Sequence, residues 1–68
     1  MPYHTLSDLP QGVREHLPRH AQEIYKEAFN NAWNEYEGRE ETAHKVAWTA
    51  VKKSYRKDEK SGKWVSAD

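Results

Sequence analysis

The side chains of this 68-residue chain that could bind a metal ion or transfer protons are four His and eleven Asp or Glu. His16 and His20 have the four-residue spacing of a metal-binding pair on a helix. Pro18 lies between them and is expected to begin a new helix, so the two rings need not share a face. A structural zinc site takes four ligands, and the chain contains no Cys. We therefore predict no metal site and no cofactor.

Glu41 and His44 form a single Glu-x-x-His pair, a spacing used by metal-binding helices. Di-iron helical bundles need this motif twice, together with further carboxylates, so one copy is expected by chance on a charged surface. The sequence also has no Gly-rich phosphate loop and no Ser, His and Asp set typical of nucleophilic catalysis. We therefore predict no catalytic residues and a protein that is not an enzyme.

The third candidate is a row of mostly basic residues spaced four, three and four positions apart: Lys45, Thr49, Lys52 and Arg56, with Lys53 beside them. On a helix this spacing places the row on one face, opposite the apolar residues. Such a row could follow a phosphate backbone, or it could contact an acidic loop of a membrane protein. We name Lys45, Lys52, Lys53 and Arg56 the basic stripe and predict that it binds a partner.

The formal charge of the chain is zero, but it is unevenly distributed. Residues 1–43 contain four Lys or Arg and eight Asp or Glu, whereas residues 44–63 contain seven Lys or Arg and two Asp or Glu. This asymmetry permits an acidic or nucleic-acid partner for the second half of the chain. A solvated helix end would give the same bias, so charge alone leaves both interpretations open.

Two Leu-Pro pairs predict where the first helices begin. Proline fits the first turn of a helix because the N–H group that it lacks would have no helical partner there. Pro10 is expected to begin a short helix that ends near His16. Pro18 is expected to begin a second helix that ends before Gly38, a residue type that commonly follows helix ends.

Residues 20–36 have a strong helical period. Their apolar residues are separated alternately by three positions and by one, a pattern that a half-buried strand does not produce. The apolar arc is wide, which indicates a helix that contacts more than one neighbour. The residues of this arc are Ala21, Ile24, Tyr25, Ala28, Phe29, Ala32, Trp33 and Tyr36.

Residues 39–56 show a matching apolar face and are expected to form the third helix. Glu40 and Glu41 lie near its start and basic residues lie near its end, which suits the helix dipole. Trp48 and Tyr55 widen the apolar face, and we expect them to cover a further element rather than stand exposed.

The connection between the second and third helices is only three residues, 37–39, and the apolar phase continues across it. A single helix from Pro18 to Arg56 would cost only about 1 kcal/mol for Gly38. That helix would have to bury its apolar face against a second copy, as in a domain-swapped dimer. We favour a helical hairpin, because connections of two residues occur, and the sequence leaves monomer and swapped dimer open.

The two ends of the chain carry short aromatic segments at residues 3–5 and 63–65. We expect these segments to pair as a minimal two-stranded sheet. The predicted fold class is therefore mainly α, a small three- to four-helix domain over residues 1–68 with a β element joining the termini. No apolar run approaches the roughly 18 residues of a membrane span, and the N-terminus does not resemble a signal peptide.

Together these segments resemble the ChaB family of small bacterial proteins. The resemblance is carried by MPY at residues 1–3, DLP at 8–10, LPRHAQEIYKEAFNNAW at 17–33, REETAHKVAWTAVK at 39–52 and KW at 63–64. It implies a compact, mainly helical cytoplasmic domain with a small β element. It also implies a role as a regulator of cation transport, associated with a sodium/calcium–proton antiporter. It implies no catalytic residues.

Family members carry a longer charged linker between the 17–33 and 39–52 segments than this chain does, so the resemblance carries over no expectation of a monomer. Two functions of different classes remain. The first is a non-catalytic regulator that binds a cation antiporter at its cytoplasmic face through the basic stripe, without inserting into the membrane. The second is a small nucleic-acid-binding protein that uses the same stripe, although no Arg or Asn set indicates base readout.

Overall fold

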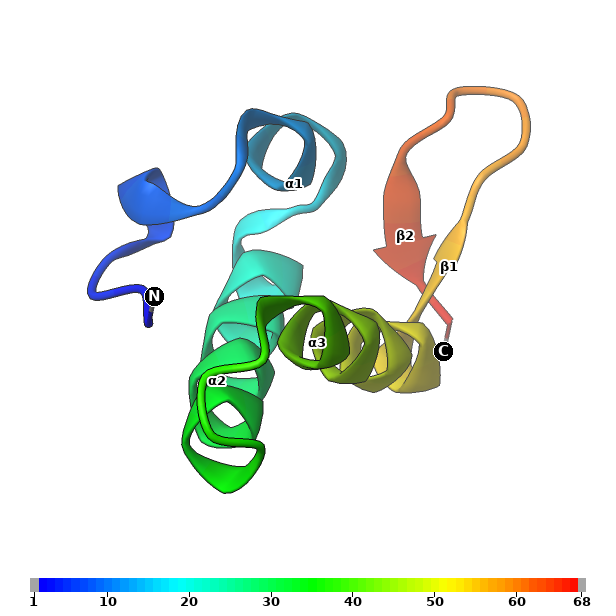
Figure 1. Cartoon of the computed structure of the whole chain (residues 1–68). Coiled ribbons are helices and arrows are strands. Elements are labelled where there is room, and N and C mark those ends of the chain that lie inside the picture. Colours follow the sequence, from blue (N-terminus) through cyan, green and yellow to red (C-terminus); the bar gives the residue numbers. More distant parts are fainter. Residues whose placement is uncertain (1, 68) are drawn as a thin grey trace.

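The computed structural model describes residues 2–67 and is mainly helical. A short 3-10 turn is followed by three α-helices and a two-stranded antiparallel hairpin (Figure 1). The elements are η1 (Leu6–Asp8), α1 (Gln11–His16), α2 (Arg19–Glu35), α3 (Glu40–Ser54), β1 (Tyr55–Lys57) and β2 (Trp64–Ser66). The predicted class, a small mainly helical domain with one two-stranded sheet, is confirmed.

Each of the first two helices begins directly after a proline, as the Leu-Pro pairs predicted. Pro10 and Pro18 are the N-cap residues of α1 and α2. The Pro10 carbonyl accepts from the backbone N–H of Val13 at 3.0 Å, and the Pro18 carbonyl accepts from the N–H of Gln22 at 2.9 Å. Each proline carbonyl thus accepts the first hydrogen bond of its helix, and the N–H group that proline lacks is not needed at this position.

A tight turn separates α2 from α3, so the helical hairpin is confirmed and the single long helix is wrong. Glu37 and Gly38 both adopt left-handed backbone conformations, with φ of 56° and 79°. The Gly38 N–H donates to the carbonyl of Trp33 at 2.8 Å, which is the long bond of a Schellman motif. Two consecutive residues with positive φ cannot continue a right-handed helix, and the chain therefore reverses here.

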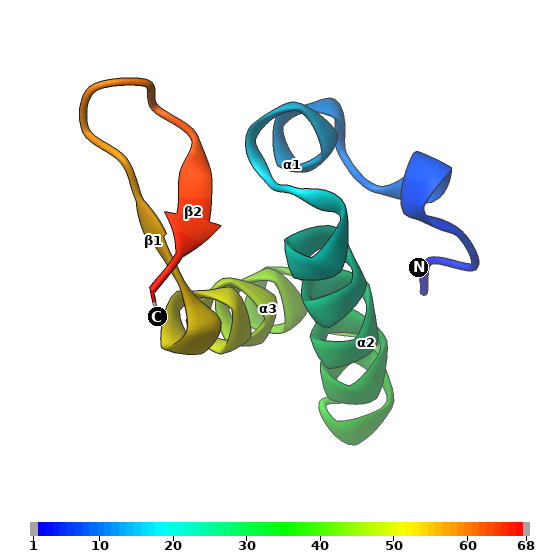
Figure 2. The same cartoon turned by 180° about the vertical axis from the view of Figure 1, so that it is seen from behind.

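The core lies where α3 crosses α2 (Figures 1 and 2). Small residues, Ala21 on α2 and Ala43 and Ala47 on α3, are fully buried and let the two backbones approach closely. Tyr25, Phe29 and Val51 are the largest fully buried side chains. Leu9, Val13 and Leu17 from the α1 region are also buried, so the N-terminal segment completes the same core.

The sheet pairs two neighbouring C-terminal segments, and the prediction that it joins the termini is wrong. Its pairs are Tyr55 with Ser66, Arg56 with Val65 and Lys57 with Trp64. These strands are separated by only six residues, so closing the loop costs little entropy, whereas a pairing with residues 3–5 would span most of the chain. Gly62 helps to close the loop with φ of 73°.

The N-terminal segment contacts the helices in a different way. The ring of Tyr3 packs on Phe29 with the centroids 4.6 Å apart. The side chain of Asn30 accepts from the backbone N–H of Tyr3 and donates to its carbonyl, both at 2.8 Å. The Asn30 amide therefore satisfies the backbone groups that a strand partner would otherwise pair.

Candidate functional site

The basic stripe is split between two elements. Lys45, Lys52 and Lys53 lie exposed on α3, but α3 ends at Ser54, where Tyr55 is already extended. Arg56 therefore belongs to β1 and does not continue the helical row, and the third helix ends two residues earlier than predicted. The reason is the pairing of β1 with β2, which holds Tyr55 and Arg56 in an extended conformation.

Within the stripe, Lys45 differs from the other cations because it is already paired. Its ammonium lies 3.7 Å from a carboxylate oxygen of Glu41, one helical turn away. Both side chains are largely exposed, so the pair adds little stability. No ion pair involves Lys52, Lys53 or Arg56 among the residues 2–67 that the structure describes. The free positive charge therefore lies at the C-terminal end of α3 and on the hairpin.

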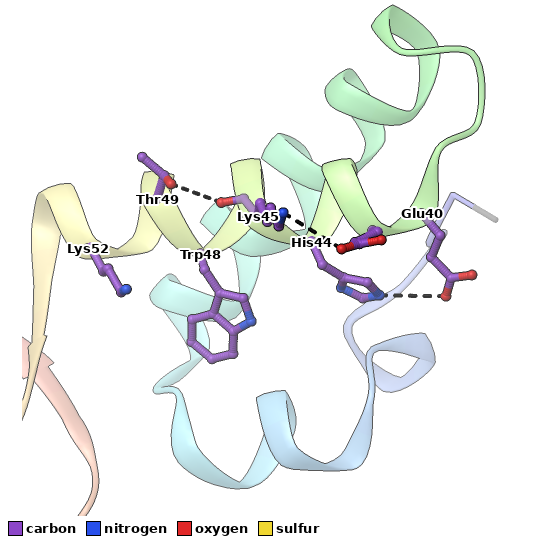
Figure 3. A pocket seen from close by; sticks show the side chains of 7 residues that line it. Glu40, His44, Lys45, Trp48, Thr49 and Lys52 are labelled. Atoms are coloured by element: carbon purple, nitrogen blue, oxygen red, sulfur yellow. Dashed lines mark hydrogen bonds and ion pairs between the residues drawn. The ribbon is translucent and has the colours of Figure 1, made fainter.

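Two adjoining hollows meet at Trp48. The first, which we call the α3 hollow, follows the exposed side of α3, and Figure 3 shows the side chains that line it. Its acidic end contains Glu40 and Glu41, and its basic end contains Lys45 and Lys52. The second hollow lies between α1, α3 and the hairpin. We call it the aromatic groove and define it by Val13, His16, Trp48, Lys52, Lys57 and Trp64.

Aromatic contacts fix the hairpin to the helices. Trp48 of α3 meets Trp64 of β2 with ring centroids 5.4 Å apart, and it meets Tyr25 of α2 edge-on at 5.2 Å. The hydroxyl of Tyr55 lies 3.1 Å from Nδ1 of His20 on α2. The expectation that Trp48 and Tyr55 cover further elements is confirmed by these contacts. Trp48 and Trp64 nevertheless remain half-buried, so part of each ring faces the groove.

A hydrogen-bonded chain of side chains links α2 to α3 beneath the groove. The Tyr25 hydroxyl bonds to Nδ1 of His44, and Nε2 of His44 lies 3.5 Å from a carboxylate oxygen of Glu40. Burial raises the pKa of Tyr25 well above its usual value, and Tyr3 and Glu40 raise it further. Tyr25 thus keeps its proton at neutral pH, and the tautomer of His44 sets which of the two groups donates in their hydrogen bond.

The sequence did not reveal this chain of side chains. The Glu-x-x-His spacing suggested Glu41 as the neighbour of His44. In the structure the carboxylate near His44 belongs to Glu40, and Glu41 pairs with Lys45. Tyr25 was recognised only as part of the apolar arc. No local spacing could have found the bond, because Tyr25 and His44 are 19 residues apart and meet only when the helices cross.

The two His residues with helical spacing lie on different helices, His16 on α1 and His20 on α2. His16 lines the aromatic groove, and His20 contacts Tyr55. Over the described residues 2–67, no group of three or more His, Cys, Asp or Glu is close enough to hold a metal ion. None of the helices in that range is sufficiently long and apolar to cross a bilayer.

Comparison with known proteins gives matches over nearly the whole chain. The sequence profile named ChaB matches residues 9–67. The "Putative cation transport regulator ChaB" of Escherichia coli K12 is 56% identical over 73 residues, covering 94% of this chain and 95% of that protein. The protein of the same name from Shigella flexneri matches equally well. The alignment is longer than the 68 residues of this chain, so these relatives contain insertions relative to it.

A solved structure is also similar. It is described as "NMR solution structure of the putative cation transport regulator ChaB" and superimposes with a TM-score of 0.87. Its sequence is 53% identical, and the match covers 98% of this chain and 100% of the other. The helical arrangement that positions the groove is therefore shared with a protein whose fold was determined by experiment.

Proposed function

This chain belongs to the ChaB family, and from that premise we propose that it regulates cation transport by binding a transporter at its cytoplasmic face. Close relatives carry the name of a cation transport regulator, which supports the general role. In this proposal the protein has no catalytic step. It acts by occupying a surface of the transporter, and the transported ion binds elsewhere.

The observation that carries the proposal is the unpaired positive charge at the C-terminal end of α3 and on β1. Lys52, Lys53 and Arg56 are exposed and form no ion pair within residues 2–67. A cluster of one sign attracts an oppositely charged loop and speeds its encounter. Lys45 contributes less in this proposal, because Glu41 already neutralises it locally. The contact is therefore the C-terminal end of α3 together with the hairpin.

Charge reversal tests the contact directly. The variant Lys52→Glu, Lys53→Glu, Arg56→Glu should lose co-purification with the sodium/calcium–proton antiporter, because an acidic loop would then meet three carboxylates. The measurement is the amount of tagged antiporter recovered from detergent extract at low and at high salt, since exposed charge contacts weaken as salt rises.

A matched control reverses the same number of charges away from the groove. Arg19 and Lys26 lie on α2, and Arg39 precedes α3. The variant Arg19→Glu, Lys26→Glu, Arg39→Glu has the same net charge as the test variant and should still recover the antiporter. If both variants bind as the wild type does, the basic stripe is not the contact and the proposal is wrong.

Nucleic acid is the alternative partner for the same cations. The geometry favours it less, because Arg56 lies on a strand and Glu40 and Glu41 line the hollow beside Lys45. Four phosphate contacts with duplex DNA would give a slope of log K against log salt of about −3.6. A slope of that size would support the nucleic-acid alternative, and absence of binding at low salt would remove it.

A further inference from the structure

We propose that the aromatic groove binds a short linear segment of a partner protein in which apolar side chains are flanked by carboxylates. This inference rests on the proposed function and specifies the chemistry that the site would recognise. The groove is built from α1, α3 and the hairpin, with Tyr25 of α2 also lining it, so it exists only in the folded protein.

Most of the exposed surface of the groove is apolar, and it includes uncovered aromatic rings. Trp48 and Trp64 are half-buried and line it from α3 and β2, and Pro10 and Val13 line it from the α1 side. The space is about 600 Å³, which is within the usual range for ligand pockets in proteins. Rigid aromatic rings in such a hollow are the residues that most often anchor a bound chain.

The charges around the groove select the sign of its occupant. Lys52 reaches it from α3 and Lys57 from β1, and neither forms an ion pair within residues 2–67. Four further residues line the groove, Pro10, Gly12, Tyr25 and His44, and none of the ten lining residues is acidic. An apolar side chain on the two Trp rings would therefore be accompanied most favourably by carboxylates at the lysine end.

The neighbouring α3 hollow gives the segment a direction. Glu40 and Glu41 lie at its far end, where they would repel further carboxylates. Lys45, which is paired with Glu41, does not reverse that local charge. The acidic residues of the segment are thus placed near Lys52 and Lys57, and its uncharged part extends toward His44.

The groove is also held in shape before anything binds. Trp48 packs on Tyr25 and on Trp64, and Tyr25 bonds to His44. Because these side chains are already held in place, binding a partner costs less conformational entropy. A free phosphate would satisfy the lysines but would leave the rings uncovered, so the geometry favours a peptide over a small anion.

The experiment uses the full chain and defined peptides. The probe is an acetylated and amidated six-residue peptide in which a Leu-Phe pair is preceded by two Gly and followed by two Glu, so that the carboxylates lie on one side of the apolar pair. Binding is followed through the indole N–H signals of Trp33, Trp48 and Trp64 in a ¹⁵N NMR titration. We expect the signals of Trp48 and Trp64 to move and that of Trp33 to stay.

Two further peptides separate charge from apolar contact. One replaces the Glu residues with Lys, and the other keeps Glu but replaces Leu-Phe with Gly-Ser. Each should bind at least about tenfold more weakly than the probe. Equal binding of the Gly-Ser peptide would mean a purely electrostatic contact and would overturn the proposal, as would equal binding of the Lys peptide.

Substitutions at exposed lysines test binding of the probe peptide without disturbing the packing of the core. Lys52→Glu, Lys57→Glu should weaken the probe about tenfold. The control Lys26→Glu, Lys60→Glu carries the same net charge at positions outside the groove and should leave binding unchanged. Trp64→Ala should abolish binding, with the far-UV circular dichroism of the helices retained. Unchanged binding by the Lys52 and Lys57 variant would overturn the proposal.

The outcomes separate this inference from the proposed function. If the probe binds as expected but the antiporter never co-purifies, the groove chemistry stands and the transporter proposal fails. If the antiporter co-purifies and the probe does not bind, the groove inference alone fails. Tighter binding of a single-stranded oligonucleotide than of the probe, with the same two Trp signals moving, would also overturn the peptide assignment.

Discussion

Tyr25 combines two roles that are usually given to different residues. Its ring is 1% exposed and packs between the helices, while its hydroxyl bonds to His44 on the opposite helix. Sequence periodicity predicts the first role, because Tyr25 lies in the apolar arc of α2. The second role depends on the crossing geometry, which no local pattern encodes. A buried hydroxyl in a mainly apolar core needs such a partner to be tolerated.

Removing the Tyr25 hydroxyl should lower stability and change its dependence on pH. Tyr25→Phe loses one hydrogen bond, worth about 1 kcal/mol in the free energy of unfolding at pH 7. In the unfolded chain Tyr25 titrates near its ordinary pKa of 10.0, whereas burial raises the pKa in the folded protein. Above pH 10 the unfolded state therefore releases a proton that the folded state retains, so the wild type loses stability as pH rises.

Urea unfolding at a series of pH values from 7 to 11 measures both effects. The difference in the free energy of unfolding between the wild type and Tyr25→Phe should become smaller above pH 10. Only the wild type loses stability through the titration of Tyr25. Tyr36→Phe is the control, since Tyr36 is 42% exposed and should change neither value. Parallel stability curves for the wild type and Tyr25→Phe over the whole range would contradict the assignment.

The helices were the most predictable elements, and the strands the least. The periods of α2 and α3 and the prolines before α1 and α2 were sufficient to locate all three helices to within two residues at most ends. The pairing of the strands could not be read in the same way. Residues 3–5 and 55–57 are both short and partly aromatic, and the shorter loop decided between them.

In the candidate site, too, the positions on the helices were predictable and the contacts between elements were not. Lys52 and Lys53 lie on α3 as predicted, because their positions follow from the helical period alone. The groove beside them was not predictable. Its walls come from α1, α3 and the hairpin, which meet through contacts between residues distant in the sequence, such as Trp48 with Trp64.

The turn between α2 and α3 gives a prediction at the scale of an element. Glu37→Gly should raise the free energy of unfolding by about 0.5–1 kcal/mol, because Gly adopts a positive φ without steric cost. Gly38→Ala should lower it by about 1 kcal/mol, since its φ is 79° and the new methyl group would lie 3.4 Å from the Trp33 ring. Thermal and urea unfolding measure both changes, and a more stable Gly38→Ala variant would contradict this account of the turn.

At the scale of the whole molecule, the apolar faces of the helices are covered mostly from within the same chain, and the aromatic groove is left open. The faces of α2 and α3 bury one another, and the N-terminal segment and hairpin cover their flanks. Tyr36 and Val65 are the large apolar side chains that stand exposed within residues 2–67. Two separate residues are too little surface for a stable dimer, which needs roughly 800 Å² from each partner.

We therefore expect a monomer. Light scattering after size exclusion should give the mass of one chain, 8.0 kDa, at every concentration tested. Gly38→Ala is the informative variant here as well, because weakening the reversal favours the extended helix and the swapped dimer. A wild-type mass that doubles with concentration would contradict the monomer and would place two aromatic grooves on each particle.

The position of the α2–α3 turn has a practical consequence. It lies at the far end of α2 from α1 (Figures 1 and 2), and α2 has 17 residues, a length of about 25 Å. The chain contains no Cys, so a single Cys in place of exposed Tyr36 would be its unique thiol. A fluorophore or a solid support attached there would leave the groove open to solution, which makes immobilised binding assays and single-molecule observation feasible on this small protein.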